Sequence, residues 1–165
     1  NDPFFGSVQN GSQSSEGIEA DLIWEPNANW SLLFNAAYVD ARNESDIVSF
    51  GTVFAAGNQL SRIPEWSGRV AARYRFTEGA LSGLGLGLGA TYSDEAPLTD
   101  ANVFFSDSYT VFDAQAGFQV GKVDVQLSII NLFDEDYVRP YQYLLQEVVR
   151  PGQERSIFLT LGVEI

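Results

Sequence analysis

Three arginines at alternating positions are the side chains of this sequence that are best placed to act together chemically. Arg69, Arg73 and Arg75 lie within the segment Trp66–Phe76, where the residues between them are apolar. Because successive side chains of a β-strand point to opposite faces, all three arginines would share one face. Such a row of guanidinium groups could draw in an anionic ligand by electrostatic focusing.

The same arginines could instead pair with carboxylates. We favour this interpretation, because charges on the inner wall of a protein need partners. The acidic residues of other extended segments that would share this polar face are Glu19, Asp21, Asp113 and Asp124. The sequence alone leaves both roles open for the arginines.

A second set of candidates consists of aromatic side chains inside long polar segments. They could line a vestibule that receives a ligand, or they could simply pack the loops in which they lie, which is the interpretation we favour. These residues are Phe50, Phe54, Phe104, Phe105, Tyr141 and Tyr143.

The composition excludes several classes of function. The balance of 9 basic to 22 acidic residues, net −13, argues against binding of nucleic acid, whose phosphates require Lys and Arg. There is no Cys and no His, so the chain can hold neither a Ser-His-Asp triad nor a His-ligated zinc site. Asp134, Glu135 and Asp136 lack the spacing of a calcium loop, which favours a solvated loop. We predict no enzyme, no metal and no cofactor.

The elements that would position these residues are β-strands. Seven segments alternate apolar residues with polar or small ones, which is the pattern of strands with one apolar face. They are residues 13–25, 30–41, 66–76, 84–93, 109–120, 123–130 and 156–165. In the fourth segment the small face consists of Gly85, Gly87 and Gly89, which suggests that another group approaches closely there.

The connections between these strands alternate in length. Residues 26–29, 77–83 and 121–122 are short, whereas residues 42–60, 94–108 and 134–151 are long. Short turns at one rim, long loops at the other and an apolar outer face are typical of outer-membrane β-barrels. Aromatic residues suited to the two membrane interfaces are Trp24, Trp30, Tyr74 and Phe76 at the short turns, and Tyr38 and Tyr92 at the long loops.

We therefore predict an all-β, transmembrane antiparallel β-barrel. Bacterial barrels have an even number of strands, and the first segment here starts on the long-loop side, so we expect further strands upstream. Two alternatives stay open. A small self-contained eight-stranded barrel with a structural or adhesive role would need a strand in Asn1–Ser12, whose Gly, Ser and Asn argue against it. A soluble β-barrel binding module fits poorly with the arginine-rich face.

Four motifs resemble the C-terminal barrel region of TonB-dependent outer-membrane receptors. Ser15–Asp21 is similar to the family's S-x-G-x-E-x-(D/E) strand, and Gly57–Pro64 to its G-N-x-L-P-x-(I/V)-P loop exit. Asn131–Tyr137 resembles N-L-F-D-x-x-Y, and Pro151–Arg155 resembles P-G-x-x-R before the final strand. The motifs occur in the family's order and extend over nearly the whole chain.

This resemblance implies a role in transport. Residues 1–165 would form about the last seven strands of a 22-stranded barrel, with the plug domain and the earlier strands outside this chain. The receptor would lie in the outer membrane of a Gram-negative bacterium and import a scarce nutrient, most often a ferric siderophore, with energy passed on by TonB. Its partners would be outer-membrane lipid, TonB and the small-molecule ligand, and it could belong to a larger assembly. The plug could also supply carboxylates to the arginines.

Overall fold

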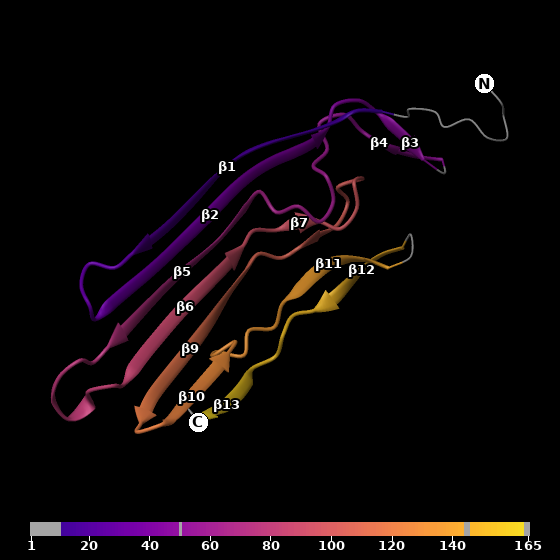
Figure 1. Cartoon of the computed structure of the whole chain (residues 1–165). Coiled ribbons are helices and arrows are strands. Elements are labelled where there is room, and N and C mark those ends of the chain that lie inside the picture. Colours follow the sequence, from indigo (N-terminus) through magenta and orange to yellow (C-terminus); the bar gives the residue numbers. More distant parts are fainter. Residues whose placement is uncertain (1–10, 50, 144–145, 164–165) are drawn as a thin grey trace.

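A single antiparallel sheet of seven strands is the largest element of the described residues. The computed structural model describes residues 11–49, 51–143 and 146–163. The strands follow one another in the sheet in chain order, so that each pairs with its neighbours along the sequence (Figure 1). They are β1 (Gln13–Trp24), β2 (Trp30–Asn43), β5 (Trp66–Arg75), β6 (Gly85–Ser93), β9 (Tyr109–Val120), β10 (Val123–Ile130) and β13 (Ser156–Val163).

All seven strands agree with the prediction from sequence periodicity, and residues 164 and 165 of the last predicted segment lie outside the described residues. The largest difference is at the end of β2, which continues to Asn43 because β1 pairs with it throughout, from Trp24 opposite Leu32 to Gln13 opposite Asn43. The predicted all-β, antiparallel fold is therefore confirmed for the part of the chain that the structure describes. Within that part, no helix has the length and apolar character needed to cross a membrane.

The long connections contain short hairpins that the sequence did not reveal. These are β3 (Ile47–Ser49) with β4 (Thr52–Phe54), β7 (Ala96–Pro97) with β8 (Phe105–Ser106), and β11 (Val138–Tyr143) with β12 (Gln146–Pro151). All three lie at one end of the sheet, whereas the short turns lie at the other end (Figure 1). Among the short turns, residues 77–84 include one turn of 3-10 helix, η1 (Gly79–Leu81), and Gly121 adopts the positive φ of 62° that its hairpin requires.

The strand register aligns one apolar face across the whole sheet. Leu22 lies opposite Phe34, Phe34 opposite Val70, and Val70 opposite Ala90, and the same alignment continues through β9 and β10 to β13. This face is not covered: Leu159, for example, is 65% exposed. The buried hydrophobic residues among those described are only Ala41, Ala96, Pro97 and Val111. An apolar face of this size without a core beneath it is suited to contact with lipid.

Aromatic side chains gather at both ends of this apolar face. At the short-turn end the ring centroids of Trp30 and Tyr74 are 4.9 Å apart, and those of Tyr74 and Phe76 are 4.8 Å apart. At the loop end the ring centroids of Tyr38 and Trp66 are 4.8 Å apart. Tyrosine and tryptophan combine an apolar ring with a polar group, which suits them to the boundary between lipid and water. The aromatic groups that the sequence predicted at both rims are present.

Candidate functional site

The polar face of the sheet carries an ion pair that crosses an entire strand. Arg69 of β5 donates from Nη1 to Asp113 Oδ2 on β9, at 2.8 Å, and to Thr91 Oγ1 on β6, at 2.6 Å. Its side chain passes over Gly89 of β6, where an added Cβ would lie 2.5 Å from Arg69 Nη2. The glycines of β6 therefore make room for the arginines of the neighbouring strand, which is the close approach that the sequence predicted without naming the approaching group.

Asp113 also links the sheet to the turn that follows β10. Its Oδ1 accepts a hydrogen bond from the backbone N–H of Asn131, at 3.2 Å. Asn131 is 1% exposed and has a positive φ of 53°. Its side chain donates to the carbonyls of Glu135 and Gln153 and accepts from the N–H of Glu135. The N-L-F-D motif thus fixes the point where the chain leaves β10 and later returns to β13.

Of the acidic residues of this turn, Asp134 has a structural role. Asp134 Oδ1 accepts from the backbone N–H of Arg155 at 2.9 Å, and Asp134 Oδ2 lies 3.4 Å from Arg155 Nη2. No group of three or more His, Cys, Asp or Glu among the described residues could hold a metal ion.

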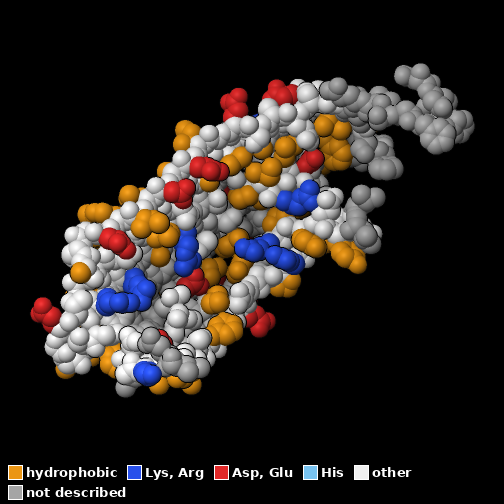
Figure 2. Space-filling model, in the orientation of Figure 1, with side chains coloured by type: hydrophobic (Ala, Val, Ile, Leu, Met, Phe, Trp, Pro, Cys, Tyr) orange, Lys and Arg blue, Asp and Glu red, His pale blue; other side chains and the backbone are white. Residues whose placement is uncertain are grey.

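The other predicted charges share the polar face but do not pair with the arginines. Arg73 and Arg75 are exposed, and Glu19, Asp21 and Asp124 lie on strands near the two edges of the sheet. Of the four predicted carboxylates, the structure brings only Asp113 to an arginine. Arg69, Arg73 and Asp113 line a hollow of about 240 Å³ in this face. Figure 2 shows basic side chains gathered along the hollowed side of the molecule.

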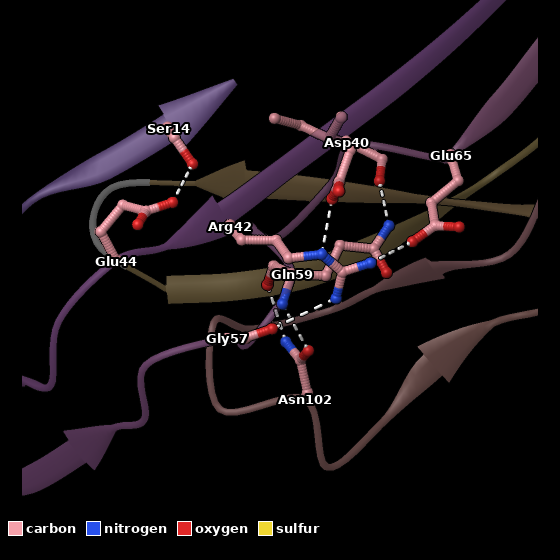
Figure 3. A network of polar contacts seen from close by, with 9 residues as sticks. Ser14, Asp40, Arg42, Glu44, Gly57, Gln59, Glu65 and Asn102 are labelled. Carbon is pink, nitrogen blue, oxygen red and sulfur yellow. Dashed lines mark hydrogen bonds and ion pairs between the residues drawn. The ribbon is translucent and has the colours of Figure 1, made fainter. Parts of the chain in front are cut away.

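A polar network holds two of the long loops together at the rim (Figure 3). Arg42, at the end of β2, pairs with Asp40 at 2.5 Å and Glu65 at 2.8 Å, and donates to the carbonyl of Gly57. Gln59 and Asn102 exchange two hydrogen bonds of 2.8 Å between the backbone of one and the side-chain amide of the other. The connection after β2 is thereby fixed to the connection after β6.

The same network includes three further contacts. Ser61 N–H donates to Asp100 Oδ1 at 2.6 Å, the Asn58 side chain donates to the Asp100 carbonyl, and Ser14 donates to Glu44. Sequence reasoning missed the whole network, although the G-N-x-L motif at residues 57–60 lies inside it. A motif in one loop does not indicate which other loop supplies its partners.

A second hollow lies at the rim, above the polar face. It has a volume of about 290 Å³, and its lining includes Arg62, Tyr109, Arg139, Tyr141 and Arg150. The Arg139 Nε–H donates to the hydroxyl of Tyr109 at 3.3 Å, which holds the pKa of Arg139 above its ordinary value. The guanidinium carbon of Arg150 lies 5.4 Å from the centre of the Tyr141 ring, a cation–π contact. The three arginines of this hollow were not among the residues predicted from the sequence.

The predicted loop aromatics do not converge on one site. Tyr141 lines the rim hollow. Phe104 is 68% exposed and Phe105 is 43% exposed, both in the connection that contains β7 and β8, and Tyr143 is 61% exposed at the end of β11. Phe54 is half-buried in β4, and Phe50 lies outside the described residues.

Comparison with known proteins places this arrangement in a family. Residues 1–132 match the model "TonB dependent receptor-like, beta-barrel". The ferrichrome outer membrane transporter/phage receptor of Escherichia coli K12 is 32% identical over 81% of this chain and 18% of its own length.

Two crystal structures show the same fold. The siderophore receptor PiuA of Acinetobacter baumannii superposes with a TM-score of 0.77 and 26% identity, over 92% of this chain and 22% of that one. The ferric-catecholate import receptor Fiu of E. coli K12 has a TM-score of 0.70 and 26% identity, over 98% of this chain and 22% of that one.

The chain spans about a fifth of the length of these relatives. The matched family is one of receptors, in agreement with the expectation that the chain is not an enzyme. The seven-stranded sheet of this chain has one apolar face and one face that carries the arginines. Its strand order and antiparallel pairing are those of a barrel wall. The chain belongs to the TonB-dependent receptor family, as a part of its β-barrel.

Proposed function

We propose that this chain forms part of the wall of an outer-membrane receptor that takes up a ferric siderophore with energy supplied through TonB. The observation that carries the proposal is the two-faced sheet: an uncovered apolar face bounded by aromatic side chains, and a polar face with Arg69, Arg73 and Arg75. The relatives support it, since they are named as a ferrichrome transporter and as siderophore and ferric-catecholate receptors.

In this proposal residues 1–165 are the C-terminal section of a 22-stranded barrel, and other parts of the receptor supply the plug and the remaining strands. The two edge strands support this arrangement. Among the described residues, β1 pairs only with β2, and β13 pairs only with β10. Each edge therefore presents unpaired backbone groups, which a membrane does not tolerate and which a further strand would satisfy.

The membrane orientation follows from the two ends of the sheet. The apolar face contacts outer-membrane lipid, the long connections with their hairpins face the cell exterior, and the short turns face the periplasm. The polar face then lines the barrel interior. There the exposed Arg73 and Arg75 are available to carboxylates of the plug, whereas Arg69 is already paired with Asp113. The loop aromatics Phe54, Phe104, Phe105, Tyr141 and Tyr143 would lie at the entrance to the barrel.

Iron uptake tests this proposal directly. Cells that produce the full receptor should take up ⁵⁵Fe from ferric siderophores under iron limitation, and cells of the same strain without TonB should not. Absence of uptake from every ferric chelate supplied, or uptake that is unaffected by loss of TonB, would refute the proposal.

The size of the native protein tests the two smaller architectures. We expect the sequence to be extracted from outer membranes only with detergent, within a polypeptide several times heavier than 18.1 kDa. A stable 18 kDa species in detergent would support a small self-contained barrel, and a soluble monomer without detergent would support a soluble binding module.

A further inference from the structure

The hairpin β11–β12 places two arginines directly opposite each other. Arg139 pairs in register with Arg150 across the two strands, so both side chains project from the same face of the hairpin. Like charges at directly opposed positions destabilise a two-stranded pair. Among the described residues, no carboxylate forms an ion pair with either guanidinium: Arg139 is bonded to the Tyr109 hydroxyl, and Arg150 lies over the Tyr141 ring. In the part of the chain that the structure describes, no ion pair offsets the repulsion between Arg139 and Arg150.

Both arginines line the rim hollow, the cavity of about 290 Å³ described above. Its lining residues come from separate parts of the chain. Arg62, in the connection before β5, contributes a third guanidinium, and it is also bonded to Gln142 of the hairpin, at 2.8 Å. Three of the nine basic residues of a chain with net charge −13 thus meet around about 290 Å³. Asp94 also lines the hollow, and its Oδ1 accepts hydrogen bonds from the Tyr92 hydroxyl and the Glu95 N–H.

The chemistry of the lining identifies what would fit. Guanidinium groups bind the oxygen atoms of anions through paired, charge-assisted hydrogen bonds, and the Tyr109 and Tyr141 rings offer flat apolar surface beside them. A neutral ligand would leave the repulsion between Arg139 and Arg150 unrelieved, whereas an anion held between them would remove it. The volume suits one lobe of a chelate rather than a whole one, since complete small-molecule sites enclose about 300–1,000 Å³.

We infer that the rim hollow is a subsite for an anionic ferric chelate, which Arg139 and Arg150 recognise in preference to a neutral one. This inference rests on the proposed transport function and adds the charge class of the ligand. The subsite joins the hairpin β11–β12 to the ends of β6 and β9, so a bound anion would also hold the hairpin against the rest of the rim.

The test compares an anionic with a neutral probe on the full receptor in detergent. The anionic probe is the ferric complex of three 2,3-dihydroxybenzoate ions, and the neutral probe is ferrichrome. Arg139→Gln and Arg150→Gln should each weaken binding of the anionic complex about tenfold, the order expected for a hydrogen bond between charged groups. Binding of ferrichrome should change less than twofold. Higher ionic strength should weaken binding of the anionic probe alone.

Arg155→Gln is the matched control. It removes one positive charge from the same end of the sheet, from an exposed pair with Asp134 at 3.4 Å that contributes little to stability. Equal losses for both probes, no loss for either, or the same loss in the control would overturn the inference. A receptor that supports TonB-dependent uptake of ferrichrome but does not bind the anionic complex refutes this inference alone. A receptor that takes up no ferric chelate refutes the proposed function as well.

Discussion

Gly89→Ala tests whether the glycines of β6 are needed for the Arg69 side chain to pass over this strand and reach Asp113. The new Cβ would lie 2.5 Å from Arg69 Nη2 and 3.1 Å from its Cζ, so the guanidinium must move away from Asp113 and Thr91. Hydrogen bonds between charged groups contribute about 1.5–3 kcal/mol. The side chains of Arg69 and Asp113 are 34% and 20% exposed, and solvent screens such a pair, so we discount that range to a loss of about 1–2 kcal/mol.

Part of this loss is offset, because alanine lowers the conformational entropy of the unfolded chain relative to glycine. This effect stabilises the folded state by about 0.4–1 kcal/mol. We therefore expect Gly89→Ala to lower the free energy of unfolding by about 1 kcal/mol. Gly87→Ala is the control on the same strand and face: its Cβ would meet nothing closer than 3.7 Å, so it should be neutral or slightly stabilising. The two variants should differ by about 1–2 kcal/mol, which is the lost ion pair alone, because the entropy term is common to both.

The assay is guanidinium-induced unfolding of the full receptor in detergent micelles, followed by tryptophan fluorescence. A double-mutant cycle with Arg69→Ala isolates the crossing, since Gly89→Ala should cease to be destabilising once the arginine is absent. If Gly89→Ala and Gly87→Ala shift the midpoint alike, or if Gly89→Ala and Arg69→Ala are additive, the glycine does not serve to admit the arginine and the reasoning is refuted.

Three further predictions concern the turn after β10 and the lipid-facing surface. Asn131→Ala removes three side-chain hydrogen bonds of a residue that is 1% exposed, so the unfolding free energy should fall by about 3 kcal/mol; an unchanged midpoint would contradict this role. Gly152→Ala would bring a Cβ into steric overlap with the ring atoms Cε1, Cζ and Cδ1 of Tyr137, so it should reduce the amount of folded, SDS-resistant receptor. The second change Tyr137→Ala should restore that amount, and failure of the rescue would count against the contact. Trp66, 51% exposed on the apolar face, should be quenched by brominated lipid, and Trp66→Phe should remove that part of the quenching; quenching by aqueous iodide instead would place this face in water.

Strand positions and faces could be predicted from the sequence because they depend on local alternation. The seven segments, the apolar stripe and the alternation of short and long connections all follow from a period of two residues. The aromatic groups at the rims, such as Trp30 with Tyr74 and Tyr38 with Trp66, follow from the same alternation once neighbouring strands pair in register.

Contacts that cross strands or loops depended on the tertiary structure. The sequence placed Arg69, Arg73 and Arg75 on one face, but only the register shows that Arg69 spans β6 to reach Asp113 while the other two remain exposed. The hairpin β11–β12 was predicted as a loop because its two short strands pair only with each other and carry no long apolar alternation. The opposition of Arg139 and Arg150 is a consequence of that pairing.

The sequence by itself therefore determined that this chain forms part of a barrel wall. In an amphipathic strand, apolar residues on the lipid side alternate with polar or small residues on the inner side, and this alternation is visible in the sequence. The tertiary structure alone decided which charges meet, which glycine admits an arginine and which arginines converge at the rim. The physical reason is distance along the chain. Asp113 lies 44 residues from Arg69, and Gln142 lies 80 residues from Arg62, so these contacts arise only when register and loop packing bring the segments together.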